Sequence, residues 1–183
     1  TGTGEVSMIG LYGKWAAGLA GEGPGSLSFR RDGWKDLETW RAAARKRTLE
    51  CMAIPDIGPA PRVEVKKKYT FDGLSIEEIS WQLPYGRPTD ALVLKPEGAR
   101  GKLPGILALH DHGGMKYFGV RKITRTSKDI HPLAAEHQRL DYEDTAWANE
   151  VAKRGYVVLV HDTFPFASRR VMLQDVPEVI RQG

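Results

Sequence analysis

The sequence predicts an α/β protein in which antiparallel opening strands lead into a parallel sheet flanked by helices. Two continuous apolar runs, PGILALHD and YVVLVHD, have the length and flanking turn signals of buried strands, and a helical segment separates them. Strand, helix and strand in this order form a right-handed crossover, so the two strands are expected to be parallel and close neighbours. Their carboxyl ends then share one edge of the sheet, where ligands bind in open α/β sheets.

The bulk composition is that of an ordinary globular chain. With 183 residues, of which 41% are hydrophobic and 27% charged, the chain is long enough for one well-buried domain. Its net charge of +4 is mildly basic, and its basic clusters lack the interleaved aromatic residues of a nucleic-acid site, so no nucleic-acid partner is expected. No apolar run approaches the roughly 20 residues of a membrane helix, so no membrane partner is expected. The single cysteine, Cys51, is expected to be a small core residue.

The first 60 residues are predicted to form a glycine-rich lead-in followed by one amphipathic helix. The lead-in is rich in glycine and its residues show no regular helical or strand spacing, which is typical of an extended segment. From about Asp32 the pattern changes, and Leu37, Trp40 and Cys51 recur at roughly helical spacing. Pro55 is expected to end this helix.

Residues 61–183 are predicted to form the α/β part of the chain. VEVKKKYTF alternates apolar and polar residues, and LSIEEISWQL and ALVLKP flank the turn-rich PYGRPTD as in a hairpin. Between the two apolar runs, DTAWANEVAKRGY is the clearest helix. Asp144 or Thr145 is expected to cap its start, and Gly155 occupies the position of a C-terminal glycine.

The ends of the two apolar runs carry the sharpest functional signal in the sequence. HDHGG follows the first run and HDTFPFASR ends the second, so His110, Asp111, His112, His161 and Asp162 are expected to converge at one edge of the sheet. Strand ends are often polar for structural reasons alone, and a pair of glycines is often only a turn. Two chemistries nevertheless suit this arrangement.

In the first chemistry, the turn is an oxyanion hole. Acyl transfer builds negative charge on a carbonyl oxygen, and preorganised backbone N–H groups stabilise it. Gly113 and Gly114 suit this role because, without a Cβ, they leave neighbouring amides uncovered. In the second chemistry, alternation along the strand places His110 and His112 on one side, and His161 or Asp162 completes a metal site.

LPGILALHDHGGMKYFG, followed by a helix that runs into AKRGYVVLVHDTFPFASR, resembles the N-terminal half of an α/β-hydrolase of the dienelactone hydrolase and acetyl xylan esterase type. The resemblance covers roughly Val63 to Arg170. It implies that the backbone amides of His112 and Gly113 contribute to the oxyanion hole, with a register uncertain by about one residue. It also implies an ester substrate, a small molecule or a carbohydrate, and no cofactor. The residues expected to line the substrate site are His110, Asp111, Gly114, Tyr117, Phe118 and Phe164.

One element of that family is absent from the sequence. Such enzymes carry the nucleophile on a G-x-S-x-G elbow, and no serine of this chain has those flanking glycines. Residues 61–183 are therefore interpreted as the N-terminal half of a hydrolase domain, completed by residues beyond 183 that carry nucleophile, acid and base. Asp162 is expected to tie down the loop after the second run, with Arg169 as its partner. The alternatives are a metal-dependent hydrolase that uses the HDH strand end and a non-catalytic binding module of the same fold.

Overall fold

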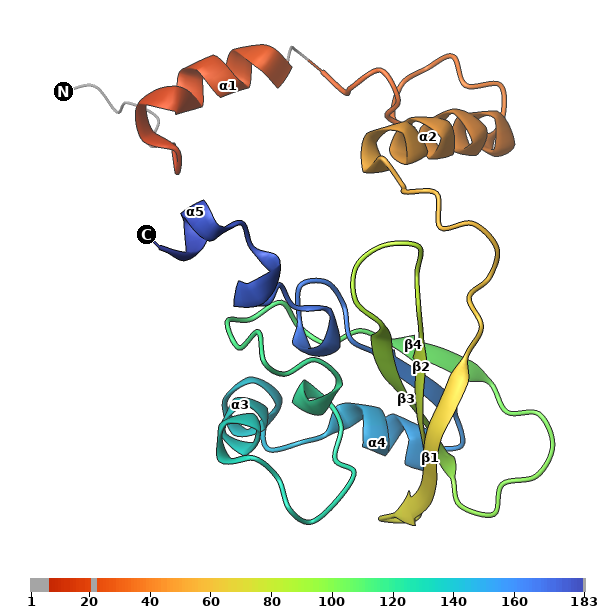
Figure 1. Cartoon of the computed structure of the whole chain (residues 1–183). Helices are drawn as coiled ribbons and strands as arrows, with labels where there is room; N and C mark the ends of the chain where they lie inside the picture. Colours follow the sequence, from red (N-terminus) through yellow and green to blue (C-terminus); the bar gives the residue numbers. More distant parts are fainter. Residues whose placement is uncertain (1–6, 21–22, 183) are drawn as a thin grey trace. The chain divides into compact units, whose positions relative to one another are not determined.

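The structure is a computed structural model that describes residues 7–20 and 23–182 (Figure 1). The chain divides into two compact units, Thr1–Asp56 and Ile57–Gly183. The larger unit contains the sheet and every residue of the predicted functional edge.

The smaller unit begins with a helical segment where the sequence analysis expects an extended one. A 3-10 turn, η1 (Gly10–Tyr12), leads directly into the helix α1 (Gly13–Ala20). The expectation of an extended lead-in is therefore wrong for these residues. The segment GKWAAGLA is rich in alanine, and these strong helix formers offset the cost of its glycines. Residues 1–6 and 21–22 of the predicted lead-in lie outside the described residues.

The second helix of this unit, α2 (Leu37–Met52), is the helix that the sequence predicts. The Asp36 side chain caps its start by accepting a hydrogen bond from the Thr39 amide at 2.7 Å. At its end Ala53 adopts a left-handed conformation, with φ of 45°. The helix therefore stops before Pro55, as expected.

Trp40 supplies the main packing contact of α2. Its indole N–H donates to the Leu27 carbonyl at 2.8 Å, and its ring lies 5.0 Å from that of Phe29. No residue of α2 is fully buried. Cys51 is exposed, so the expectation that it is a core residue is wrong, because the apolar side of this helix has little to pack against within the unit.

The larger unit is built on a mixed sheet that has five strands in the described part of the chain. Their order is β1-β2-β3-β5-β4. Neighbours pair antiparallel, except that β4 and β5 are parallel. The predicted hairpin and the predicted parallel pair are both confirmed, and so is the α/β class. The strands are β1 (Glu64–Phe71), β2 (Leu74–Trp81), β3 (Thr89–Pro96), β4 (Gly105–Ala108) and β5 (Val157–His161).

The strand register brings three chain segments to one edge of the sheet. Ala108 pairs with Val160, so β4 and β5 end side by side. Ala91, near the start of the antiparallel strand β3, pairs with His161. The loop between β2 and β3 therefore lies at the same edge as the loops that follow β4 and β5.

Two helices and a 3-10 turn connect β4 to β5: η2 (Val120–Lys122), α3 (Pro132–Tyr142) and α4 (Trp147–Lys153). Figure 1 shows α3 and α4 on the same side of the sheet; α4 contacts β2, β3 and β5, whereas α3 contacts η2. After β5 the chain forms η3 (Ala167–Arg169), η4 (Leu173–Asp175) and a last turn of helix, α5 (Glu178–Arg181).

The start of α4 differs from the prediction. Its N-cap residue is Ala146, which makes no capping hydrogen bond through its side chain, rather than Asp144 or Thr145. Glu143 and Asp144 both have positive φ, 52° and 59°, so the chain is still turning out of α3 where the cap was expected. Gly155 follows the helix with φ of 100°, as the sequence predicts for a C-terminal glycine.

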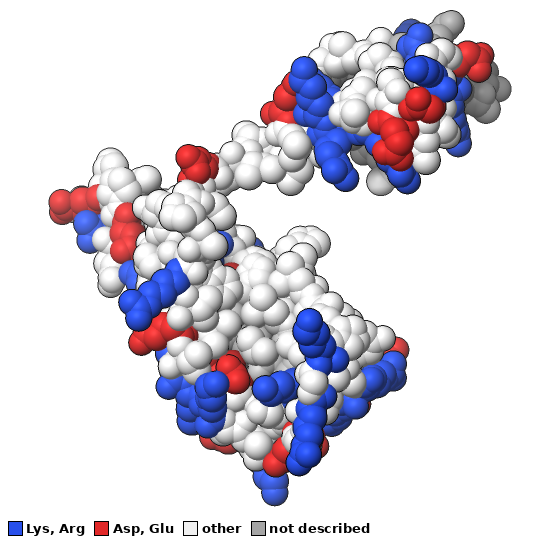
Figure 2. All heavy atoms as spheres, turned by 90° about the vertical axis from the view of Figure 1, so that its right-hand side faces the viewer, with Lys and Arg blue, Asp and Glu red and all other residues white. Residues whose placement is uncertain are grey.

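The hydrophobic core lies on the face of the sheet that α4 covers. β4 was expected to be covered on both faces, but its other face is open in the described structure: Leu107 is 57% exposed and Leu109 is 55% exposed. Figure 2 shows an uncharged area on the larger unit with lysines and arginines at its margins. None of the described helices combines the length and hydropathy needed to cross a membrane. The buried core residues are Leu74, Ile76, Leu92, Leu94, Ala108, Ile123, Ala148, Ala152, Val158 and Val160.

Candidate functional site

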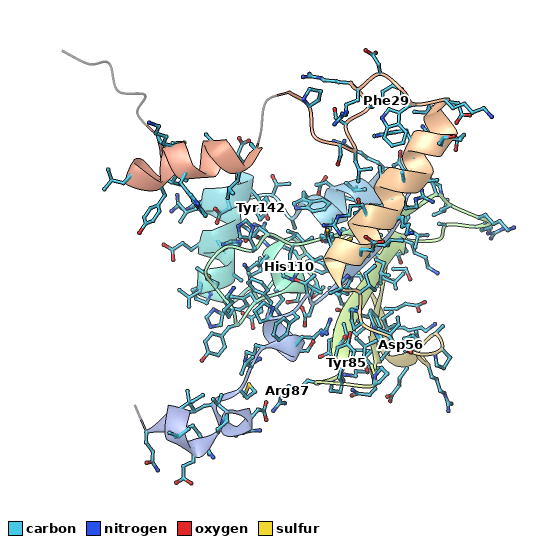
Figure 3. The ribbon with its side chains drawn as sticks, turned by 90° about the horizontal axis from the view of Figure 1, so that it is seen from above. Phe29, Asp56, Tyr85, Arg87, His110 and Tyr142 are labelled. Atoms are coloured by element: carbon cyan, nitrogen blue, oxygen red, sulfur yellow. The ribbon has the colours of Figure 1, made fainter. Side chains whose placement is uncertain are left out.

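His110, labelled in Figure 3, joins the two loops that leave the shared edge of the sheet through a hydrogen bond with Thr163. Its Nε2 accepts a hydrogen bond from the Thr163 amide at 3.1 Å, so the ring proton sits on Nδ1, which donates to the Asp111 carbonyl at 2.9 Å. The ring packs edge-on against Phe166 with centroids 4.9 Å apart. Burial lowers the pKa of His110, which favours the neutral form that these contacts require.

The Asp111 carboxylate is the centre of a polar network beneath the HDHGG turn. Its Oδ1 accepts from the Gly113 amide at 2.8 Å and from Lys122 Nζ at 3.1 Å. Its Oδ2 accepts from Tyr142 Oη at 2.7 Å and from His137 Nε2 at 2.9 Å. Burial alone would raise the pKa of Asp111, but the hydrogen bonds from Tyr142, His137 and Lys122 outweigh burial and hold that pKa well below its usual range.

Lys122 has a completely buried side chain, although lysine is almost never buried without a partner. Besides Asp111, its ammonium group donates to the Gly113 carbonyl at 2.8 Å and lies 4.5 Å from the centre of the Phe166 ring. The same lysine therefore holds both a side chain and a backbone carbonyl of the turn. Because an unpaired buried ammonium costs several kcal/mol, about 3 to 5, this arrangement depends on Asp111.

The helix α3 supplies the other side of the network. His137 lies between two carboxylates, with Nε2 facing Asp111 and Nδ1 2.8 Å from Asp141 Oδ2. His137 therefore contacts a carboxylate oxygen through each of its two ring nitrogens. Burial and the hydrogen bond to Asp111 raise the pKa of the Tyr142 phenol well above its usual range, so Tyr142 stays a donor.

The network determines which backbone amides of the turn are free. The Gly113 amide is already used by Asp111. The amides of His112 and Gly114 have no hydrogen-bond acceptor among the described residues, and both residues are exposed. Two backbone donors are thus available at the carboxyl edge of the sheet. They flank Gly113, which is held by its hydrogen bonds with Asp111 and Lys122.

The aromatic residues predicted to line the site lie in different surroundings. Tyr117 is 75% exposed, with the Arg170 guanidinium 5.2 Å from its ring centre. Phe164 is 63% exposed. Phe118 is buried, and its ring lies 5.2 Å from that of His131. Tyr117 and Phe164 are therefore accessible to a ligand, whereas Phe118 packs under the loop.

Asp162 ties down the loop after β5, as the sequence predicts, but through other partners. This buried carboxylate accepts hydrogen bonds from the Val120 amide at 2.9 Å and from the Ser168 amide at 3.0 Å. The expected partner, Arg169, makes no ion pair with it. Since Val120 begins η2, which carries Lys122, Asp162 also positions the lysine under the turn.

The arrangement required by the metal alternative is not found. His110 directs Nε2 at Thr163, and His161 Nδ1 lies 3.1 Å from the Asp162 carbonyl with its ring against Trp81. Within residues 7–20 and 23–182, no group of three or more His, Cys, Asp or Glu side chains gathers as metal ligands do. The metal alternative gains no support from these residues.

A cavity of about 480 Å³ opens at the same edge of the sheet. We call it the arginine pocket. Its wall residues include Tyr85, Arg87, Phe164, Arg169, Arg170 and Asp175.

Sequence reasoning missed most of this site. Of the pocket residues it named only Phe164 as a ligand contact, and of the network it named Asp111 and Gly113 but not Lys122, His137 or Tyr142. The i, i+4 spacing of His137 and Asp141 on one helix is the signal that could have drawn attention to α3. Nothing in the local sequence around Lys122 distinguishes it from a solvent-exposed lysine.

Comparisons with known proteins support the fold. No protein-family model matches the chain, and no curated protein matches it. A crystal structure of a Bacteroides fragilis protein described as a "putative acetyl xylan esterase" matches with a TM-score of 0.59 and 24% identity, over 90% of this chain. The chain has an α/β-hydrolase-like fold. It spans 40% of the length of that neighbour. A methylesterase structure matches with a TM-score of 0.48 and 18% identity, covering 78% of this chain and 28% of that one.

The contact between Gly119 and Asp162 yields a first prediction. A methyl group added at Gly119 would overlap Asp162 Oδ1 and lie 3.2 Å from the Ala167 Cβ, whereas one added at Gly114 would meet nothing within 4 Å. Gly119→Ala is therefore expected to lower the free energy of unfolding by about 1 to 3 kcal/mol. Gly114→Ala, the matched control, should change it by less than about 0.5 kcal/mol. Urea denaturation measures both, and equal effects would contradict the described loop.

The network yields a second prediction. Asp111→Ala leaves the Lys122 ammonium buried without its counter-ion, and should cost about 3 to 5 kcal/mol of unfolding free energy. Lys122→Met removes that charge but leaves Asp111 with three donors, and should cost about 1 to 3 kcal/mol.

The double variant tests the coupling between these two residues. Because it leaves no unpaired buried charge, its cost should be smaller than the sum of the single costs by at least about 1 kcal/mol. Chemical denaturation of the four proteins in one buffer gives the coupling energy. Additive costs would show that the pair does not interact as described.

Proposed function

We propose that the protein is a serine carboxylic-ester hydrolase of the acyl- or acetyl-esterase type, and that this chain supplies its oxyanion-hole turn and part of its substrate pocket. The observation that carries the proposal is the pair of unengaged backbone amides, at His112 and Gly114, in a turn fixed from below by Asp111 and Lys122. The hydrolase-like fold places this turn at the carboxyl ends of parallel strands, where the ligands of open α/β sheets bind.

In this proposal the turn stabilises the transition state electrostatically. When a nucleophile attacks an ester carbonyl, the oxygen becomes negatively charged, and each preorganised N–H donor lowers the barrier by about 3 to 4 kcal/mol. Of the two predicted amides, that of Gly113 has an intramolecular acceptor in Asp111 Oδ1. The proposal therefore relies on the His112 amide as donor, with the Gly114 amide beside it. Gly113 serves as the point at which the network holds the turn.

Substrate contacts in this proposal come from the accessible side chains around the turn. Tyr117 and Phe164 are both largely exposed and present aromatic surface to a ligand. His110 and Asp111, which the sequence analysis also expects at the substrate site, support the turn through Thr163 and Lys122. The acyl group and the alcohol of the ester are not specified by these contacts.

The proposal assigns the nucleophile, the acid and the general base to residues beyond 183, because no G-x-S-x-G elbow occurs in the sequence. Two features of β4 support a larger sheet. No described strand pairs with its outer edge, and Leu107 and Leu109 leave an apolar face open. Unpaired edges and open apolar faces of this kind are normally covered in native sheets.

A pair of substitutions in the full-length protein tests the proposed donor. His112→Pro removes the backbone N–H, whereas His112→Ala keeps it and removes only the imidazole. His112→Pro is expected to lower kcat for p-nitrophenyl acetate by about a hundredfold or more, and His112→Ala by less than about tenfold. Near-UV circular dichroism checks that both variants fold.

Labelling by a fluorophosphonate probe tests the serine mechanism separately. A folded, full-length protein that hydrolyses esters should be labelled, and His112→Pro should be labelled more slowly. Complete loss of activity in both His112→Ala and His112→Pro would contradict the oxyanion assignment and favour a metal ligand, because both variants lose the imidazole and only His112→Pro loses the amide. A folded protein without labelling or hydrolysis would favour a non-catalytic module.

A further inference from the structure

The arginine pocket lies beside the proposed oxyanion turn. Phe164, on its wall, directly follows Thr163, which donates a hydrogen bond to His110 of the turn. On the other side, the Arg170 guanidinium stacks over the ring of Tyr117, just beyond the turn. Because the loop between β2 and β3 reaches the same edge of the sheet, it adds Tyr85 to the wall. A ligand bound at the turn can therefore extend into this pocket.

The charges of the pocket do not balance. Arg87 is neutralised by Asp175, with Nε 2.9 Å from Oδ2 and Nη2 3.3 Å from Oδ1. Arg170 donates to the Ala167 carbonyl at 2.8 Å, an acceptor that carries no charge. The side chain of Arg169 makes no hydrogen bond or ion pair with any residue that the structure describes. Three arginines face one carboxylate, so two positive charges are left without a counter-ion.

The shape and apolar surface of the pocket suit an organic ligand rather than a small inorganic ion. Its volume of about 480 Å³ lies within the range of small-molecule sites, roughly 300 to 1,000 Å³. Tyr85 and Phe164 contribute partly exposed aromatic rings to its wall. Such rings pack against the apolar face of a ligand, while the planar guanidinium fork binds a carboxylate through two parallel hydrogen bonds.

From this combination we propose that the arginine pocket binds a carboxylate on the substrate, so that the preferred esters are those of carboxylate-bearing molecules such as acidic sugars. Arg169 is the residue that pairs with the carboxylate, and Arg170 adds a second positive charge. Phe164 and Tyr85 contact the body of the ligand. This inference rests on the proposed ester hydrolysis for its catalytic consequence, but the binding of a carboxylate by the pocket does not depend on it.

Binding to the full-length protein is tested first without any reaction. In an NMR or calorimetric titration, methyl glucuronoside should bind at least about tenfold more tightly than methyl glucoside, and added salt should weaken this binding. Arg169→Gln should remove the preference, and Arg169→Lys should retain only part of it because a lysine lacks the fork. Arg100→Gln, the matched control, makes the same charge change on an exposed residue at the opposite edge of the sheet, and should leave the preference intact.

Hydrolysis is then compared for acetyl esters of the same two glycosides. The acidic ester should have the higher kcat/KM by about tenfold or more, and Arg169→Gln should abolish this difference by raising KM for the acidic ester, whereas Arg100→Gln should keep it. Binding of the glucuronoside without hydrolysis of either ester would contradict the proposed function but would still support the assignment of the pocket as a carboxylate site. Hydrolysis without any preference for the acidic ligand would overturn the pocket assignment alone. Equal binding of methyl glucoside 6-phosphate would also overturn it, because the site would then be a general anion site.

Discussion

The ion pair between Asp111 and the fully buried Lys122 is the interaction on which the candidate site depends. A buried ammonium needs several acceptors, and the turn supplies them as the Asp111 carboxylate and the Gly113 carbonyl. The carboxylate in turn takes the Gly113 amide. Both polar groups of one glycine are therefore fixed to the interior. The neighbouring amides of His112 and Gly114 are left without an acceptor in the described protein, which is what an oxyanion hole requires.

This ion pair links the turn to the rest of the sheet edge. Lys122 is held in place through Asp162, which accepts a hydrogen bond from the amide at the start of η2 and another from the loop after β5. His110 makes the reverse connection, from the turn to Thr163 in that same loop. The loops after two parallel strands are thus tied together twice. Because the arginine pocket is formed partly by the loop after β5, turn and pocket are held by the same set of contacts.

The sequence predicted the sheet better than it predicted the site, and the reasons are physical. β4 and β5 were predictable because a continuous apolar run between turn signals has few other structures to adopt. The helix α1 was not predicted because its glycines are typical of extended segments, whereas the alanines and leucine between them stabilise a helix. Lys122 was missed because burial of a lysine depends on partners that are distant in sequence, here Asp111 and Phe166. For the same reason, the sequence could not reveal that Asp111 already engages the Gly113 amide.

Amide hydrogen exchange, followed residue by residue by NMR, tests the central claim most directly. The account predicts that the Gly113 amide exchanges slowly, because it donates to Asp111, and that the His112 and Gly114 amides exchange at nearly the rate of an unstructured chain. In Asp111→Ala the Gly113 amide should lose its protection. Fast exchange at Gly113 in the unaltered protein, or strong protection at both His112 and Gly114, would contradict the account.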